Sequence, residues 1–168
     1  MKSKLLVASS KMKRYYLFLS LIALLFLSCE KDDFCIDPIT PNMIIRFYDA
    51  TNTSNTKSVS NLSVNPEGLD VIYSNESLDS ILIPLDVTSG QIIYNFSKGN
   101  NQDIITIDYD VEEVFVSRSC GFKAIFNNVT VTSDVSNDWI IGLTETSENT
   151  ITIPTIENES AAHLQIFH

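Results

Sequence analysis

Basic residues and histidines are scarce in this sequence of 168 residues. Beyond residue 28 it contains six lysine or arginine residues against 21 acidic ones, a formal charge of −15. Clustered Lys and Arg bind nucleic-acid phosphates and anionic lipid surfaces, so this balance disfavours both as direct partners. The two histidines, His163 and His168, stand at the end of the sequence, and no base stands near Ser117 or Ser119. We therefore predict no catalytic residue and no enzyme.

A helical period is also absent after residue 28. Short runs rich in β-branched and aromatic residues recur about every ten residues instead, with turn-forming residues between them. In one run, Met43, Ile45 and Phe47 share a face. The pattern predicts an all-β fold, a single antiparallel β-sandwich or a barrel. Trp139 follows every cysteine, so the Cys…Trp…Cys order of immunoglobulin domains is missing and the fold is only loosely immunoglobulin-like.

The expected strands form one domain over residues 36–168. They are 43–50, 59–64, 69–74, 80–86, 90–97, 103–110, 113–120, 122–128, 129–133, 138–145, 149–154 and 161–168. The polar run 51–58 is predicted to be a loop. Phe122, Ala124 and Phe126 alternate along their strand, so we expect all three to face the core.

One long apolar run, Tyr15–Ser28, follows a basic leader near the start of the sequence. A basic region followed by an uncharged apolar region of this length is typical of a signal peptide. A membrane-spanning helix needs about 20 apolar residues, and this run is shorter. We predict that residues 1–28 are a cleaved signal peptide, with an uncleaved anchor as the alternative and Met12 as an alternative start to Met1.

The end of this apolar run resembles the lipobox of bacterial lipoproteins. Ser28, a small residue, directly precedes Cys29, although Phe26 stands where that class usually has leucine. The resemblance implies that Cys29 is acylated with palmitate-type chains and becomes the first residue of the mature chain. Several acyl chains anchor a protein stably, so the resemblance implies membrane attachment without a spanning helix.

An acidic run follows the lipidated cysteine within the tether 29–35. Glu30, Lys31, Asp32 and Asp33 resemble the export signal that sends bacteroidete-type lipoproteins to the outer face of the outer membrane. A solvated tether is the alternative, because charged runs are usually solvated. We expect an outer-membrane protein, with the cell surface favoured over the periplasmic face.

Two cysteines remain once Cys29 is lipidated. The compartment is oxidising, so we predict a disulfide between Cys35 and Cys120, with two separate thiols as the alternative. This disulfide would close a loop of about 85 residues and stabilise the fold by about 4 kcal/mol at most. It would also fix the start of the domain close to the lipid anchor.

Several motifs together resemble one uncharacterised family of small bacteroidete-type lipoproteins, a domain of unknown function. The motifs are C-x-K-D-D-x-C at 29–35, IIRFYD at 44–49, FVSRSCG at 115–121 and AAHLQI at 161–166. The resemblance covers nearly all of the mature chain. It implies a lipoprotein signal and a compact β domain, and it implies no activity.

The best candidate for a metal site is an acidic strand. Asp108, Asp110 and Glu112 stand two residues apart, so their carboxylates share one face, with Glu113 and Asp103 nearby. Such oxygens can bind Ca²⁺, although the spacing is not that of an EF-hand. The alternative is the solvated outer face of a strand in an acidic protein. We predict no cofactor, with Ca²⁺ as the competing hypothesis.

Three functional hypotheses follow. The first is a non-enzymatic envelope or surface module that binds a protein or glycan partner or serves a structural role. The second is a carbohydrate- or calcium-binding accessory domain, and the third is a hydrolase that uses paired carboxylates. Aromatic residues that can stack on sugars or fill the core are Tyr48, Tyr73, Tyr94, Tyr109 and Trp139. Ser80 matches a short O-glycosylation pattern of bacteroidete-type secreted proteins.

Overall fold

The computed structural model describes residues 15–16, 35, 40–134 and 139–168. The chain divides into two compact units, Met1–Phe34 and Cys35–His168, and every strand described below lies in the second unit. Within the described ranges, no helix has both the length and the apolar character needed to cross a bilayer.

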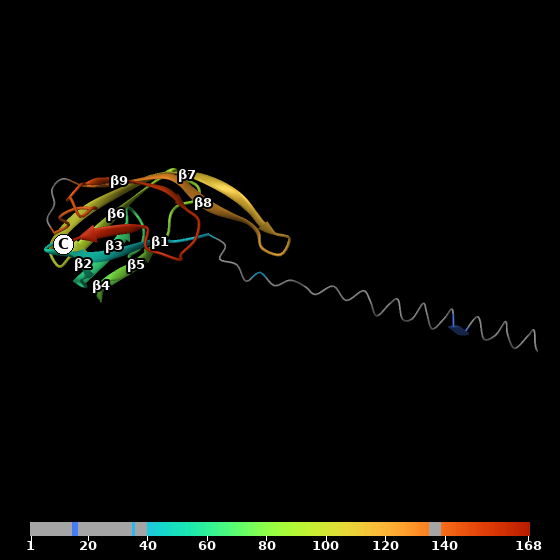
Figure 1. Cartoon of the computed structure of the whole chain (residues 1–168), viewed down its shortest axis with the longest axis horizontal. Coiled ribbons are helices and arrows are strands. Elements are labelled where there is room, and N and C mark those ends of the chain that lie inside the picture. Colours follow the sequence, from blue (N-terminus) through green and yellow to red (C-terminus); the bar gives the residue numbers. More distant parts are fainter. Residues whose placement is uncertain (1–14, 17–34, 36–39, 135–138) are drawn as a thin grey trace, which may run out of the picture. The chain divides into compact units, whose positions relative to one another are not determined.

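The second unit is built from two β-sheets, which confirms the prediction of an all-β sandwich (Figure 1). The strands of the larger sheet are, in spatial order, β4 (Tyr73–Leu78), β3 (Val59–Pro66), β6 (Gln91–Lys98), β7 (Asn101–Ser117), β8 (Gly121–Ser133) and β9 (Thr150–Ile156). The strands of the smaller sheet are β10 (Leu164–Phe167), β1 (Met43–Asp49), β2 (Asn52–Thr56) and β5 (Ser80–Ile83). Neither order returns to its first strand, so the sandwich replaces the alternative of a closed barrel.

One strand pair departs from the antiparallel expectation. β1 and β10 pair in parallel, from Ile45 opposite Leu164 to Tyr48 opposite Phe167. Parallel neighbours need a crossover connection, because a tight turn can only join antiparallel strands. Here the whole larger sheet intervenes in sequence between β1 and β10, so the chain can return to the smaller sheet in the same direction.

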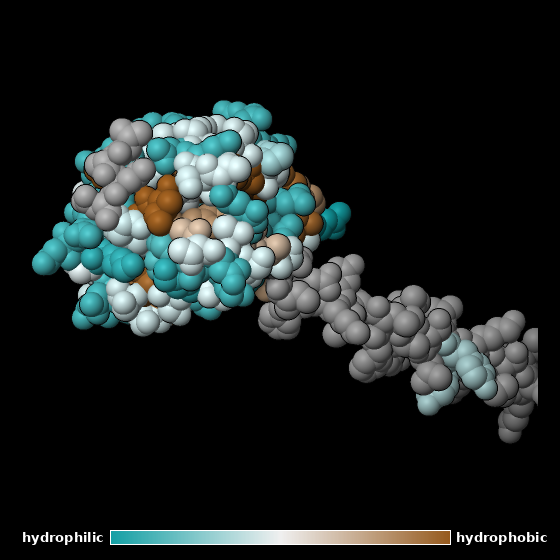
Figure 2. Space-filling view, turned by 60° about the vertical axis from the view of Figure 1, so that its left-hand side comes forward, coloured by the Kyte–Doolittle hydropathy of each residue, from teal (hydrophilic) through white to brown (hydrophobic). Residues whose placement is uncertain are grey.

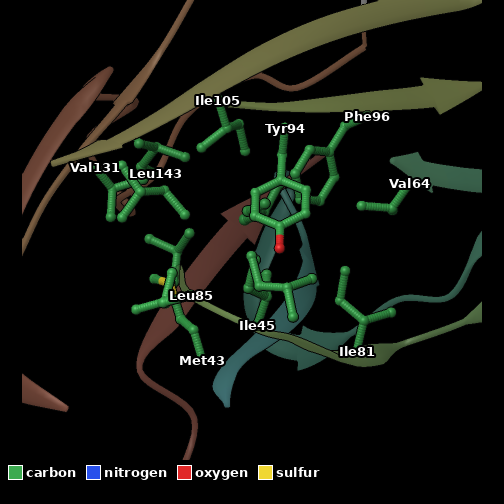
Figure 3. Packing of buried hydrophobic residues seen from close by; sticks show 14 of the residues in the cluster. Met43, Ile45, Val64, Ile81, Leu85, Tyr94, Phe96, Ile105, Val131 and Leu143 are labelled. Atoms are coloured by element: carbon green, nitrogen blue, oxygen red, sulfur yellow. The ribbon is translucent and has the colours of Figure 1, made fainter. Parts of the chain in front are cut away.

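The hydrophobic core lies between the two sheets. The predicted inward side chains of β1, Met43, Ile45 and Phe47, are fully buried, and they face buried residues of β6 such as Tyr94 and Phe96. Figure 3 shows Tyr94 among these side chains, with its hydroxyl directed toward the smaller sheet. Burying one large apolar side chain contributes about 1.5–3 kcal/mol, so this alternation supplies most of the driving force for folding.

The long β7–β8 hairpin merges four predicted strands into two. β7 continues through the expected break at 111–112, and β8 continues past residue 128. The hairpin turns between Ser117 and Gly121, where Gly121 has a φ of +73° that glycine adopts at little cost. One prediction is wrong here: Phe122 does not face the core but is 60% exposed, because the hairpin extends past the smaller sheet.

Two other strand predictions need correction. The polar run predicted to be a loop contains β2, which forms because it pairs with the end of β1. The expected strand at 69–74 begins only at Tyr73, because a turn at Gly68 (φ +74°) leaves Leu69 and Val71 exposed. The extent of these two strands is therefore set by backbone pairing and by the position of a turn, not by side-chain alternation.

The expected strand at 138–145 is a loop in its described part, although it forms one isolated bridge at Gly142. Its alternation is broken, because the neighbours Trp139 and Ile140 are both buried. The fully buried carboxylate of Asp103 accepts hydrogen bonds from both of their backbone N–H groups, at 3.0 and 2.8 Å. The Asp103 side chain thus accepts the hydrogen bonds that a neighbouring strand would otherwise accept from this segment.

Replacing Asp103 with alanine is expected to destabilise the fold strongly. Each of the two buried N–H groups would lose its acceptor, at a cost of about 1–3 kcal/mol apiece. Urea denaturation of Asp103→Ala measures the loss. The matched control is Asp108→Ala on the exposed face of the same strand, which we expect to change stability by about 0.5 kcal/mol or less. Equal effects of the two substitutions would contradict this role for Asp103.

Candidate functional site

The predicted acidic face of β7 forms as expected, but its carboxylates are separated. Asp108, Asp110 and Glu112 are all exposed, and Asp103 is buried on the opposite face. Each exposed carboxylate accepts a hydrogen bond from an amide side chain. The donors are Gln91 Nε2 to Asp108 at 2.6 Å, Asn128 Nδ2 to Asp110 at 2.8 Å and Asn127 Nδ2 to Glu112 at 2.8 Å.

This spacing is poorly suited to one metal ion. Alternate residues of a strand lie about 6.6 Å apart, whereas oxygens that share one Ca²⁺ each lie about 2.4 Å from it. Among the residues that the structure describes, no three acidic, histidine or cysteine side chains gather as a metal site would require. The acidic face therefore forms a row of separate hydrogen-bonded carboxylates.

An open groove of about 550 Å³ lies beside the end of β3, where it meets the segment that follows β5. Its lining includes Pro66, Leu69, Pro84, Asp86 and Ile92. Leu69 is 67% exposed, so the groove has an apolar rim. Figure 2 shows that the visible face of the domain is mostly hydrophilic or neutral, with a few separate hydrophobic patches. A groove of this kind suits the binding of an apolar surface.

Asp86, one of the polar residues at the groove, is hydrogen-bonded within the protein. The Asp86 carboxylate accepts from the Thr88 backbone N–H at 2.8 Å and from its hydroxyl at 2.7 Å, and these bonds lower the pKa of Asp86. The Tyr109 hydroxyl donates to the Asp86 carbonyl and accepts from its N–H, both at 2.9 Å. No catalytic pair of acid and base is formed by these groups.

Two tyrosines that were considered for sugar stacking instead hold the wall of the groove. Tyr94 is fully buried and donates to the Pro84 carbonyl, and Tyr109 is almost fully buried. Burial raises the pKa of Tyr109 to about 12 and that of Tyr94 further still, so both hydroxyls remain protonated donors. Trp139 is also buried, and its indole N–H donates to the Phe96 carbonyl.

His168 is a buried structural residue in the smaller sheet. Its Nε2 donates to the Lys57 carbonyl at 3.1 Å, because a carbonyl can only accept, and its Nδ1 lies 3.4 Å from the Lys98 ammonium. Phe47 and Trp139 pack edge-on against the imidazole. Burial lowers the pKa of His168, and the two lysine charges lower it further. The imidazole is therefore neutral at pH 7.

His163 has a similar role beside β1. Its Nδ1 accepts from the Ile44 N–H and its Nε2 donates to the Asn158 carbonyl, both at 2.9 Å. Burial lowers the pKa of this imidazole as well. The ring nitrogens of His163 thus bond two backbone groups, and those of His168 lie against the Lys57 carbonyl and the Lys98 ammonium. Each imidazole therefore has partners within the domain.

The disulfide predicted from the sequence is present. Cys35 and Cys120 are joined with their Cα atoms 4.8 Å apart, and Cys120 lies in the turn of the β7–β8 hairpin. Arg118 lies in the same turn, where the Ser117 hydroxyl accepts from the Cys120 N–H at 3.0 Å. The predicted pairing is therefore confirmed, while Cys29, whose lipidation led to it, lies outside the described residues.

Other predicted positions have no site around them or lie outside the described residues. Ser80 begins β5, where its hydroxyl donates to the Ile45 carbonyl at 3.2 Å, so glycosylation at this position would compete with that bond. The lipidation and export positions, Cys29 and Glu30–Asp33, lie outside the described residues. The groove was missed by sequence reasoning, because its lining comes from three separated segments.

The fold defines the class of this protein: a two-sheet β-sandwich whose two histidines and buried tyrosines form hydrogen bonds within the domain. Residues 61–168 match the model of a family of unknown function, DUF6452, and the chain belongs to that family. This confirms the expectation of an uncharacterised family. No curated protein and no solved structure is a significant match.

The free energy of unfolding is expected to fall as the pH drops below about 6.5, where free histidine begins to protonate. The folded-state pKa values of His163 and His168 are lowered, so the unfolded chain binds these protons first. The contribution of the two histidines to the free energy of unfolding is therefore fully present above this pH and decreases toward about pH 5. Urea denaturation across this range measures the effect. In the variant His163→Gln/His168→Gln the dependence should flatten, and an unchanged slope would contradict this origin.

Calcium is expected to have no effect on thermal stability, because the row of carboxylates cannot converge on one ion. The melting temperature should be equal with excess Ca²⁺ and with EDTA. The variant Asp108→Asn/Asp110→Asn is the control for any non-specific effect of divalent ions. A rise in melting temperature with Ca²⁺ that this variant abolishes would restore the calcium hypothesis.

Proposed function

We propose that this protein is a membrane-anchored, non-enzymatic module of the cell envelope, held by acyl chains on Cys29. The observation that carries the proposal is the Cys35–Cys120 disulfide, six residues beyond Cys29. Disulfides persist in oxidising compartments and are rare in the cytosol. Together with the basic leader, the apolar run and the Ser28–Cys29 pair, the disulfide supports export of the domain and anchoring at its first residues.

The non-enzymatic part of the proposal is supported by how the reactive side chains are used. Both histidines are neutral, and their ring nitrogens bond the Ile44 N–H, the Asn158 carbonyl and the Lys57 carbonyl. The carboxylates Asp86, Asp108 and Asp110 each accept hydrogen bonds from neighbouring side chains. General acid–base catalysis needs a titratable group within reach of a substrate proton, and these groups have structural partners instead.

The groove beside β3 is the best candidate for partner binding. Its lining includes the exposed Leu69, and Val71 and Ile72, which follow Leu69 in the β3–β4 turn, are exposed as well. Sugar recognition relies on exposed aromatic rings, whereas Tyr94 and Tyr109 here are buried. An apolar segment of another protein fits this chemistry better than a glycan, so a protein partner is favoured over the carbohydrate alternative.

Fractionation and protease treatment of intact cells test the anchor and its location. We expect the chain in the membrane fraction and Cys29→Ala in the soluble fraction, because only acylation attaches it. We also expect external protease to degrade the domain on whole cells, with Glu30–Asp33 acting as the export signal. The variant Asp32→Asn/Asp33→Asn is the matched control and should become protected from the protease.

Two results would contradict parts of this proposal. Membrane association that survives Cys29→Ala would overturn the lipid anchor. A wild-type domain that resists protease until the outer membrane is opened would overturn the surface location and leave a periplasmic module.

A further inference from the structure

The β7–β8 hairpin continues as a two-stranded arm past its neighbours in the sheet (Figure 1). β6 pairs with β7 only as far as Asp108, and β9 pairs with β8 only as far as Phe126. β7 and β8 nevertheless pair with each other to Ser117 opposite Gly121. The end of the arm therefore has no strand beside it in the larger sheet among the described residues.

An aromatic pair lies near the end of this arm. Phe115 of β7 stands directly opposite Phe122 of β8, and their rings pack edge to face with centroids 5.5 Å apart. Phe122 shares its strand face with Ala124 and Phe126, which are buried in the core. The core-facing side of the larger sheet thus continues beyond the smaller sheet, and Phe115 and Phe122 remain 57% and 60% exposed.

The disulfide fixes the distance of this pair from the proposed lipid anchor. Cys120 lies two residues before Phe122, and its Cα is 4.8 Å from that of Cys35. Cys35 follows Cys29 by six residues, which span at most about 22 Å when fully extended. An acylated Cys29 would therefore hold the end of the arm within about 27 Å of the membrane surface.

The charge at the end of the arm also fits a lipid surface. No acidic residue occurs between Glu113 and Asp134, whereas Arg118 and Lys123 both lie in this interval. The mature chain as a whole is strongly acidic and would be repelled by lipid phosphates. The end of the arm carries Arg118 and Lys123 instead, which lipid phosphates would attract. Glu113 lies two residues before Phe115 on the same face of β7. Insertion of the arm past Glu113 would bury its carboxylate in lipid, which is unfavourable.

We infer that Phe115 and Phe122 form a membrane-docking patch, which enters the interfacial region of the leaflet that holds the acyl chains of Cys29. This inference rests on the proposed lipid anchor and adds a second attachment point to it. Aromatic side chains gain free energy at the boundary between headgroups and acyl chains. Two attachment points would fix the orientation of the domain, whereas a single flexible tether would let it rotate.

Tryptophan fluorescence in vesicles tests the docking. The lipidated full chain is purified as Phe122→Trp and reconstituted in phosphatidylcholine vesicles with or without brominated acyl chains, which quench nearby tryptophan. The matched control is Leu69→Trp, because Leu69 is also exposed, at 67%, but lies far from the end of the arm. Leu69 and Ile93 line the same groove, and Ile93 pairs with Thr106 of β7. Thr106 precedes Phe115 by nine residues on β7, about 30 Å along the strand.

We expect the emission added by Phe122→Trp to shift to shorter wavelength and to be lost in brominated vesicles. Leu69→Trp should keep its added emission, and the wild-type chain gives the background from buried Trp139. Phe115→Trp provides a second, independent probe of the same patch. Equal spectra in brominated and unbrominated vesicles for both Phe115→Trp and Phe122→Trp would overturn the inference. The same result is expected if the patch binds a second copy of the chain or another protein instead of lipid.

Flotation of the same vesicles separates this inference from the proposed function. A wild-type chain that does not float with vesicles would overturn the lipid anchor, and the docking inference would fail with it. A chain that floats through Cys29 but shows no quenching at Phe115 or Phe122 would overturn the docking alone.

Discussion

The smaller sheet depends on one strand, β1, whose backbone pairs on both edges. β10 pairs with it in parallel along one edge, while β5 and then β2 pair with it antiparallel along the other. Its inward side chains, Met43, Ile45 and Phe47, are fully buried against the larger sheet. Because every other strand of the smaller sheet is hydrogen-bonded to β1, this single strand both assembles that sheet and closes the core.

Both histidines reinforce the same strand, and a buried carboxylate holds the segment whose Trp139 ring packs against Phe47 of that strand. His163 extends the hydrogen bonding of β10 by accepting from Ile44, and His168 packs its ring against Phe47. Asp103 holds the segment at Trp139 beside this cluster. Histidine, aspartate and tryptophan are residue types that suggest catalysis or ligand binding in a sequence, yet here they satisfy backbone groups that no strand partner reaches.

Sequence reasoning succeeded where side-chain alternation and burial agree. β1 and the buried half of β7 alternate apolar and polar residues, so their inward faces were predictable, and the count of cysteines gave the disulfide. It failed where that signal is missing or misleading: β2 is polar throughout, and the segment at Trp139, expected to be a strand, is a loop in which two neighbouring residues are buried. The groove could not be predicted, because its walls meet only through long-range contacts. Phe122 was misassigned because a sequence pattern gives the face of a strand but not how far the opposite sheet extends.

The exposed end of the β7–β8 hairpin is held in place by a covalent constraint, the Cys35–Cys120 disulfide. A two-stranded ribbon with uncovered phenylalanines is marginal in water, since neither the core nor adjacent strands support it. The Cys35–Cys120 disulfide ties this ribbon to the first residues of the domain, where the proposed anchor begins. The link stabilises the ribbon and, with the proposed acyl anchor, would hold its apolar face near a lipid surface.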